Sequence, residues 1–248
     1  MREAIVTGVS RGLGEALARV LLDRGWSVTG IGRASGAQLA GERYRFVAYD
    51  FADPAGVDAA LVAPLTAVAA RKPAVVCLVN NAAVAEPIGV VGTLGAADLV
   101  HALAVNLAGP AALANLFCRV FASAGGERRI VNVSSGAAAR PLAGSAHYSV
   151  AKAGLEMLTA AIAAEQGATG IRAVSLRPGI IATDMQVLMR SQPDERLPTA
   201  AMFRDFHAQG QLVAPDTAAA RIATYVVEGS VDQGRMYAYA ELGSPPPK

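Results

Sequence analysis

The sequence predicts an α/β fold: a doubly wound, mostly parallel sheet of about seven strands with helices on both faces. Short β-type runs alternate with helical periods along the chain, which is the pattern of strands joined by crossover helices. The run AVVCLVN at 74–80 is almost entirely apolar, as expected of a strand that is covered on both faces. Of the 248 residues, 53% are hydrophobic, which is enough for one large core.

The elements follow in order from the N-terminus. Residues 4–7 (AIVT) are the first expected strand, and a helix follows because apolar residues recur at helical spacing from Leu13 to Leu21. Gly25 is expected to end this helix. Later strands are expected at 27–31, 45–49, 75–79, 130–133, 174–176 and 236–239, and helices near 55–70, 96–121, 148–166 and 215–228, with a kink at Pro110.

The chain is expected to form one domain over 1–248, because no Pro/Gly/Ser-rich linker divides it. Two stretches stand outside the regular alternation. Residues 183–213 depart from it, and SPPPK at 244–248 is expected to be loose.

Charge and composition argue against several functional classes. The net charge is +2, and the short basic spots at 71–74 (RKPA) and 127–130 (ERRI) are expected to be solvated loop ends, so a nucleic-acid partner is not expected. No unbroken apolar run is long enough to span a membrane, and MREAIVTG has no signal-peptide core, so a cytoplasmic location without a membrane partner is expected. Cys77 and Cys118 lie in apolar segments as buried thiols do, and the scattered single histidines predict no metal site.

TGVSRGLG at 7–14 lies between the first strand and the first helix. Glycines at this position permit a tight turn and let a pyrophosphate approach the helix N-terminus, where free N–H groups favour anions. The spacing is T-G-x-x-x-G-x-G, so an ordinary strand–helix turn is the alternative. Placement in the first βα unit favours nucleotide binding.

The end of the second expected strand, GIGR, has no acid to hold a ribose 2′-hydroxyl. It has Arg33, and the glycine loop contains Arg11; two guanidinium groups are suited to a 2′-phosphate, which favours NADP (NADPH) over NAD. The alternative is that both arginines are simply solvated. Asp50 is suited to accept a hydrogen bond from an adenine amino group, or else to cap the helix ahead of Pro54.

HYSVAK at 147–152 places Tyr148 and Lys152 four residues apart at the start of an expected helix. They therefore lie one above the other on the same face. Alone, this pattern is equally typical of an amphipathic surface pair.

Taken together, the motifs resemble the short-chain dehydrogenase/reductase family along nearly the whole chain, which implies a Rossmann fold. The family's spacing between its serine and its tyrosine selects Ser135, thirteen residues before Tyr148. In NNAA, Ala83 stands where the family usually has glycine. The matching segments are TGVSRGLG (7–14), NNAA (80–83), Asn106 in LAVNLAG, VNVSS (131–135), HYSVAK (147–152) and RPGIIATDM (177–185).

The resemblance also implies which residues hold the dinucleotide. These are Gly8, Ser10, Arg11, Gly12, Leu13, Gly14, Arg33, Asp50, Phe51, Asn80, Ala82, Tyr148, Lys152, Pro178, Gly179, Ile181 and Thr183.

For catalysis, the resemblance implies that Tyr148 protonates the oxygen of a carbonyl reduced by hydride. A phenol has an ordinary pKa of about 10, and the ammonium group of Lys152, with the cofactor's charge, is expected to lower it. Lys152 would also hold the nicotinamide ribose, Ser135 would orient the substrate carbonyl, and Asn106 would support a water-linked proton path behind Lys152.

The last 65 residues or so resemble the sepiapterin reductase branch, including benzil reductase-like enzymes. Where that branch has an aspartate that fixes the pterin, this chain has Ala238, with Glu241 three positions beyond. A pterin such as sepiapterin therefore stays a candidate substrate.

The segment 183–213 is interpreted as a substrate lid, with Met185 and Met189 as substrate contacts. Its apolar residues have helical spacing, so core packing is the alternative for about half of them. A Met-rich surface adapts to varied apolar ligands, which favours a hydrophobic or aromatic small-molecule carbonyl substrate, such as a 1,2-dicarbonyl.

The function that follows is an NADPH-dependent carbonyl reductase. The alternatives are an NAD-dependent alcohol dehydrogenase of the same family and a dinucleotide-binding regulator without catalysis. The regulator is disfavoured because both Tyr148 and Lys152 are present.

The helices near 96–121 and 148–166 are poor in charge on their expected outer faces. Two such helices side by side would expose an apolar patch that monomers rarely tolerate. A homodimer or homotetramer with a four-helix interface is therefore expected, and helical phase places Ala161 on that face.

Overall fold

The computed structural model describes residues 1–243, so the expectation for 244–248 lies outside the described residues. A 7-stranded sheet has the order β3-β2-β1-β4-β5-β6-β7, and each neighbouring pair is parallel. The expected doubly wound fold is confirmed. The strands are β1 (Arg2–Thr7), β2 (Ser27–Gly32), β3 (Tyr44–Ala48), β4 (Val75–Asn80), β5 (Glu127–Val133), β6 (Ile171–Arg177) and β7 (Met236–Ala238).

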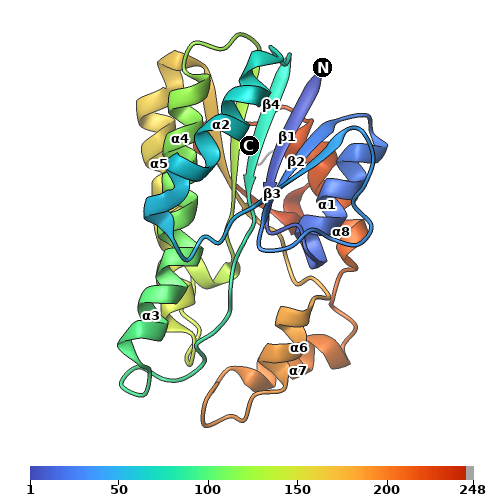
Figure 1. Ribbon diagram of the computed structural model, residues 1–248. Coiled ribbons are helices and arrows are strands. Elements are labelled where there is room, and N and C mark those ends of the chain that lie inside the picture. The colour runs from blue at the N-terminus through green and yellow to red at the C-terminus, as the bar shows by residue number, and fades with distance from the viewer. Residues whose placement is uncertain (244–248) are drawn as a thin grey trace.

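Helices cover both faces of the sheet (Figure 1). One face carries α1 (Gly12–Asp23) and α8 (Pro215–Ile222), and the other carries α2 (Val57–Ala70), α4 (Gly109–Phe121) and α5 (Ala146–Gln166). The shorter helices are α3 (Ala96–Leu103), α6 (Asp184–Arg190) and α7 (Ala200–Ala208), with 3₁₀ turns at Pro54–Gly56, Gly136–Ala138, Gly167–Thr169 and Tyr239–Glu241.

Alternate strand residues supply two separate core layers. Ala4 of β1 pairs in register with Val28 and Cys77, and all three pack under α1 and α8. The next residue, Ile5, is opposite Leu78 of β4, and both pack under α2 and α4. Both faces of the central strands are thus buried, which explains their nearly unbroken apolar sequences.

Two expected helices are interrupted by π-helical turns. The stretch 96–121 contains one at Ala104–Ala108, and the stretch 215–228 contains another at Ala223–Val227. The expected kink at Pro110 therefore takes the form of a wide turn just before the proline. Proline has no N–H to donate, so α4 restarts where that bond is not needed.

The expectation that ERRI at 127–130 is a solvated loop end is wrong. β5 and β6 each begin three residues earlier than expected, and 127–129 lie in β5. Arg129 is 1% exposed and donates to the carbonyl oxygens of Val226 and Val227 at the end of a π-helical turn. The sequence alone does not distinguish a buried arginine that binds main-chain carbonyl oxygens from an exposed one.

The basic spot at 71–74 is also not fully solvated. Arg71 donates through Nε and Nη2 to the two carboxylate oxygens of Glu3, at 2.7 and 2.8 Å. Glu3 is completely buried at the start of β1, so this bidentate pair satisfies a carboxylate that would otherwise be costly to bury.

Among residues 1–243, the stretch Ala96–Phe121 is long and apolar enough to cross a membrane by length and composition. Polar residues such as His101 and Asn106 interrupt its apolar sequence. Half of its most apolar window is buried inside the chain, as in a core helix.

Of the two thiols, Cys77 is buried as expected and Cys118 is only partly buried. Burial raises the pKa of Cys77 to about 12 and that of Cys118 to about 11.

A second carboxylate joins elements on the α1–α8 face of the sheet. Glu228 accepts hydrogen bonds from Nε1 of Trp26 at 2.9 Å, from Arg24 at 2.6 Å and from Arg2 at 3.0 Å. Burial raises the pKa of Glu228, but the hydrogen bonds from Trp26 and Arg24, with the charges of Arg24 and Arg2, outweigh it and leave the pKa below its ordinary value.

We expect Glu228→Gln to lower the free energy of unfolding by about 1–3 kcal/mol at pH 7, because charge-assisted hydrogen bonds are lost. Since the folded pKa lies below the ordinary 4.5, this stabilisation is present above that pH and disappears as pH falls through the folded pKa. Urea unfolding at several pH values measures it. Asp232→Asn, at an exposed pair with Arg235, is the control and should change little; equal losses in both variants would contradict the prediction.

Candidate active site

The glycine loop connects the carboxyl end of β1 to α1. Gly12 has φ of +63°, a left-handed conformation that glycine adopts at low cost. A Cβ on Gly14 would lie 2.2 Å from the carbonyl oxygen of Gly8, so α1 can begin against the end of β1 only because position 14 has no side chain. No side chain among residues 1–243 caps the first turn of α1. Its N–H groups are therefore suited to a pyrophosphate, as predicted.

The segment after β4 holds this loop in place. Oγ1 of Thr7 accepts hydrogen bonds from the main-chain N–H groups of Asn81 and Ala82, both at 2.9 Å. The side chain of Asn81 donates back to the carbonyl oxygens of Thr7 at 2.9 Å and Gly8 at 3.3 Å. Asn81 is not among the predicted site residues, although it stands in NNAA directly after the predicted Asn80.

Asn80 itself points into the protein. Its Nδ2 donates to Oδ1 of Asn132 at 2.9 Å, and Asn132 donates to Thr159, which also accepts from Ser175. This chain of buried polar groups joins β4, β5, α5 and β6. The side chain of Asn80 is occupied within the sheet, so its predicted contact with the cofactor stays a prediction for the main chain.

The predicted cofactor contact of Phe51 is likewise left to its main chain. Its ring is 4% exposed and packs in the core layer under α2 and α4, so only its main chain can face a ligand. Asp50 is exposed, and its carboxylate accepts from the N–H of Ala52 at 3.0 Å. The alternative that Asp50 caps the next helix is wrong, because Asp53 does so by accepting from the N–H of Gly56.

The two arginines proposed for a 2′-phosphate are both exposed. Nη1 of Arg11 is 3.2 Å from a carboxylate oxygen of Asp184, and the two side chains are 73% and 69% exposed. An ion pair this exposed is weak, so Arg11 can exchange Asp184 for another anionic partner. Arg33 forms no ion pair within residues 1–243. Of the other loop residues chosen, Ser10 is exposed, and Leu13 has its side chain in the core.

Ser135, Tyr148 and Lys152 meet where the end of β5 faces the first turns of α5. Lys152 is 2% exposed, and its Nζ donates to the carbonyl oxygen of Val133 at 2.8 Å. The same Nζ is 5.5 Å from the centroid of the half-buried Tyr148 ring. Ser135 Oγ accepts from the N–H of Ala137 at 3.2 Å. The surface-pair alternative for Tyr148 and Lys152 is therefore wrong.

Burial changes the two pKa values in opposite directions. Burial raises the pKa of Tyr148 to about 12, and hydrogen bonding to Ser135 offsets only part of the increase. Burial lowers the pKa of Lys152 to about 8. Desolvation of the phenolate is the larger effect in the protein without its cofactor, so the expected lowering of the Tyr148 pKa by Lys152 together with the cofactor's charge stays a prediction.

Asn106 lies in the π-helical turn before α4 and is completely buried. Its Oδ1 accepts from the N–H of Val84 and its Nδ2 donates to the carbonyl oxygen of Val84, both at 2.8 Å. The oxygen and the nitrogen of this side chain therefore both bind the main chain after β4. The expected water-linked proton path behind Lys152 is thus left to the main chain of Asn106.

Pro178 and Gly179 follow β6 at the same edge of the sheet. Gly179 has φ of +80°, and a Cβ there would lie 3.3 Å from the side chain of Tyr239. Ala238, the last residue of β7, pairs with the end of β6, and Glu241 is exposed in the turn that follows.

The segment 183–213 leaves and rejoins the fold at one point. Ile181 forms an isolated parallel bridge with Val213, and the N–H of Ala182 donates to Val213 at 2.9 Å. Thr183 contacts the glycine loop, since a Cβ on Gly12 would lie 3.2 Å from its methyl group. α6 and α7 then form a pair beyond the carboxyl ends of the strands (Figure 1).

An apolar cluster fills the space between this pair and the loops after β4 and β5. Met189 and Phe203 are buried within it, which confirms core packing for these two, whereas Met185 is half-buried. The buried members are Ala85, Ile88, Met189, Leu197, Ala200 and Phe203, and the partly buried ones are Leu142, Met185, Leu188, Met202 and Phe206.

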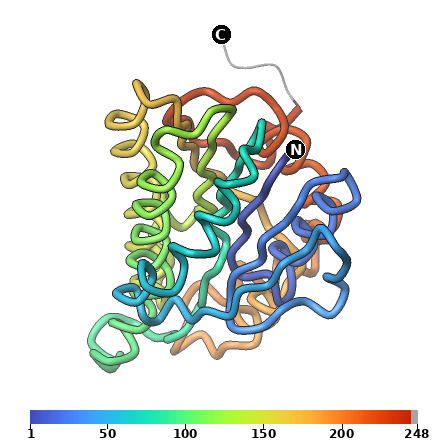
Figure 2. Tube along the Cα trace, turned by 45° about the horizontal axis from the view of Figure 1, so that its top comes forward, coloured from blue at the N-terminus to red at the C-terminus, as the bar shows by residue number. Residues whose placement is uncertain are grey.

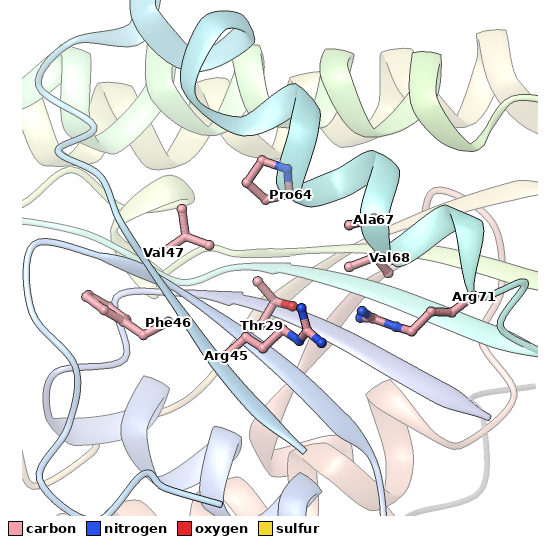
Figure 3. A pocket seen from close by; sticks show the side chains of 8 residues that line it. All are labelled: Thr29, Arg45, Phe46, Val47, Pro64, Ala67, Val68 and Arg71. Carbon is pink, nitrogen blue, oxygen red and sulfur yellow. The ribbon is translucent and has the colours of Figure 1, made fainter. Parts of the chain in front are cut away.

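A surface pocket of about 430 Å³ lies elsewhere, between β2, β3 and α2 (Figure 3). The guanidinium groups of Arg45 and Arg71 point toward each other there, and Arg71 is already paired with Glu3. None of the residues that line the pocket belongs to the glycine loop or to the cluster around Tyr148, so the chemistry is not located in this pocket.

The family model described as short chain dehydrogenase matches residues 2–194. The benzil reductase ((S)-benzoin forming) of Bacillus subtilis (strain 168) is 29% identical over 240 residues, with 96% of this chain and 98% of that protein covered.

Solved structures agree. A short chain dehydrogenases/reductase from Saccharomyces cerevisiae has a TM-score of 0.84 at 26% identity, with 96% of each chain covered. The 3-ketoacyl-(acyl-carrier-protein) reductase from Brucella melitensis, complexed with NADH, has a TM-score of 0.76 at 27% identity, again with 96% of each chain covered. The chain therefore belongs to the short chain dehydrogenase family of oxidoreductases, which bind a nicotinamide dinucleotide and act on alcohol or carbonyl groups.

Proposed function

We propose that this protein is an NADPH-dependent carbonyl reductase that converts an apolar ketone or 1,2-dicarbonyl to an alcohol. The observation that carries the proposal is the meeting of Ser135, Tyr148 and Lys152 at the carboxyl ends of the strands. The uncapped N-terminus of α1, which begins against Gly8, fits the pyrophosphate of a dinucleotide.

The bound dinucleotide would supply the hydride. Tyr148 carries a proton at neutral pH, because burial raises its pKa to about 12. Lys152 with the cofactor's charge would lower that pKa and so allow the phenol to donate to the substrate oxygen. Ser135 directs its hydroxyl toward the same oxygen and stabilises the developing charge. Lys152, held by Val133 at 2.8 Å, has its ammonium group beside the ring of Tyr148 and would hold the nicotinamide ribose.

The preference for NADPH rests on charge. Arg33 is exposed and Arg11 has only an exchangeable surface partner, so both can turn to a 2′-phosphate. An NAD-dependent alcohol dehydrogenase is the second candidate, because a solved relative holds NADH.

The apolar cluster under α6 and α7 favours a substrate without charge. A benzil reductase is among the relatives, and the half-buried Met185 packs against the cluster that contains the buried Met189. A pterin is less well supported, because Ala238 provides no carboxylate and Glu241 is exposed. We propose residues 183–213 as the lid of this site.

Tyr148→Phe should lower turnover at least about 10²-fold, since the proton donor is lost, and leave NADPH binding nearly intact. Lys152→Ala should reduce both turnover and cofactor affinity. NADPH consumption with a panel of apolar ketones and dicarbonyls measures turnover, and NADPH fluorescence titration measures binding. Near-normal turnover in Tyr148→Phe would exclude the mechanism, and wild-type binding without turnover on the whole panel would favour the non-catalytic regulator.

Arg33→Asp should weaken NADPH use more than NADH use, because the 2′-phosphate would lose a partner and meet a like charge. The ratio of kcat/KM for the two cofactors is the measurement. Arg43→Asp, at an exposed residue just before β3, is a control for a general charge effect. A wild-type protein that already prefers NADH would contradict the assignment.

We also propose a homodimer or homotetramer through α4 and α5, which lie side by side (Figures 1 and 2). On α5, Met157 is 71% exposed and Val150 is 60% exposed, and Ala161 is exposed as helical phase predicts. Ala161→Arg should shift the protein toward the monomer in sedimentation velocity experiments. Arg at the exposed Ala201 of α7 is the control, and a monomeric wild type at micromolar concentration would refute the interface.

A further inference from the structure

A carboxylate on α5 joins the ends of two strands. Oε1 of Glu156 accepts from Oγ of Ser134 at 2.7 Å and from Nε of Arg177 at 2.7 Å, and its Oε2 accepts from Nη2 of Arg177 at 2.8 Å. Ser134 follows the end of β5, and Arg177 is the last residue of β6. The Nε and Nη2 groups of Arg177 thus both donate to the same carboxylate.

The contact is protected from solvent and charge-assisted. Glu156 and Arg177 have side chains only 22% and 23% exposed, and Ser134 is 2% exposed. Burial raises the pKa of Glu156, but hydrogen bonds from Arg177 and Ser134 and the charge of Arg177 outweigh it, so the pKa is below its ordinary value. The acid is therefore ionised at neutral pH, and the bidentate geometry fixes direction as well as distance.

Each partner is next in the chain to a group of the proposed active site. Ser134 precedes Ser135, and Arg177 precedes Pro178. Glu156 lies one helical turn after Lys152, so the phenol, the ammonium and the carboxylate follow one another along the same stripe of α5. Ser134 Oγ also lies 3.4 Å from the carbonyl oxygen of Lys152, which brings the end of β5 against α5 at a second point.

We propose that Glu156 is a positioning residue: it locks α5 to the ends of β5 and β6 and thereby sets Tyr148 and Lys152 against Ser135 and the Pro178–Thr183 segment. The inference rests on the proposed function. Glu156 does not touch the reacting atoms; it acts through the two strands. A displacement of about 1 Å between reacting groups can cost about 10²-fold in rate, so one link at this junction has a large effect on turnover.

The test compares Glu156→Gln with Glu165→Gln. Both are isosteric changes on α5, and Glu165 is exposed and in no ion pair among residues 1–243. Glu156→Gln should lower kcat between about 10- and 100-fold with KM for the carbonyl changed less than about threefold, and Glu165→Gln should match the wild type. Arg177→Gln removes the other half of the link and should give the same loss.

A double-mutant comparison separates positioning from general loss of structure. In a Ser135→Ala background, Glu156→Gln should cost less than about threefold, because one of the groups that it positions is already gone. Equal losses with and without Ser135 would overturn the proposal, as would a large fall in kcat for Glu165→Gln.

A second readout does not depend on activity. Hydrogen exchange by mass spectrometry should show faster exchange of the amides in 134–138 and 177–183 for Glu156→Gln than for Glu165→Gln. Unchanged exchange there would overturn the proposal even if turnover falls. A wild type that reduces no carbonyl with either cofactor would refute the proposed function instead, and exchange would still decide whether Glu156 holds the two strand ends.

Discussion

The parallel direction of all seven strands is the constraint on which this site depends. It places the carboxyl ends of β1, β4, β5 and β6 at one edge, so residues more than a hundred positions apart in sequence, such as Gly14 and Tyr148, face the same space. Parallel pairing requires crossover helices, and both faces are covered by them (Figure 1). The first of these helices can begin so close to the edge only because Gly14 has no side chain.

Buried polar contacts at both ends of the strands hold this arrangement. At the amino-terminal edge, Glu3 with Arg71 and the carbonyl-bound Arg129 satisfy charges inside the fold. Beneath the site, Asn80 and Asn132 extend a hydrogen-bonded chain across the sheet toward α5. Such groups are costly to bury unpaired, so each permits only one arrangement of the elements that it joins. Rigid support of this kind is what a site made from several loops requires.

In the protein without a cofactor, desolvation has the largest effect on the pKa values of Tyr148 and Lys152. The pKa of Tyr148 is raised to about 12 and that of Lys152 is lowered to about 8, so burial brings the phenol and the ammonium toward their neutral forms. Tyr148 therefore keeps its proton at neutral pH in this state. The apolar cluster around Met189 extends the same low-polarity environment to the side where a substrate would enter.

The sequence by itself determined the fold class, the strand order of appearance, the glycine loop and the pair Tyr148–Lys152, because these depend on local periodicity and on spacing within one turn. The resemblance to the family added Ser135, through the family's spacing between its serine and its tyrosine. Only the tertiary structure decided which neighbouring residue faces the loop, Asn80 or Asn81, and that Phe51 and Arg129 are buried. These outcomes depend on contacts between distant segments, for which a residue's own neighbours in sequence carry no signal. The same reason hid Glu156: its partners Ser134 and Arg177 are 22 and 21 residues away, and they meet only because β5, β6 and α5 end at one edge of the sheet.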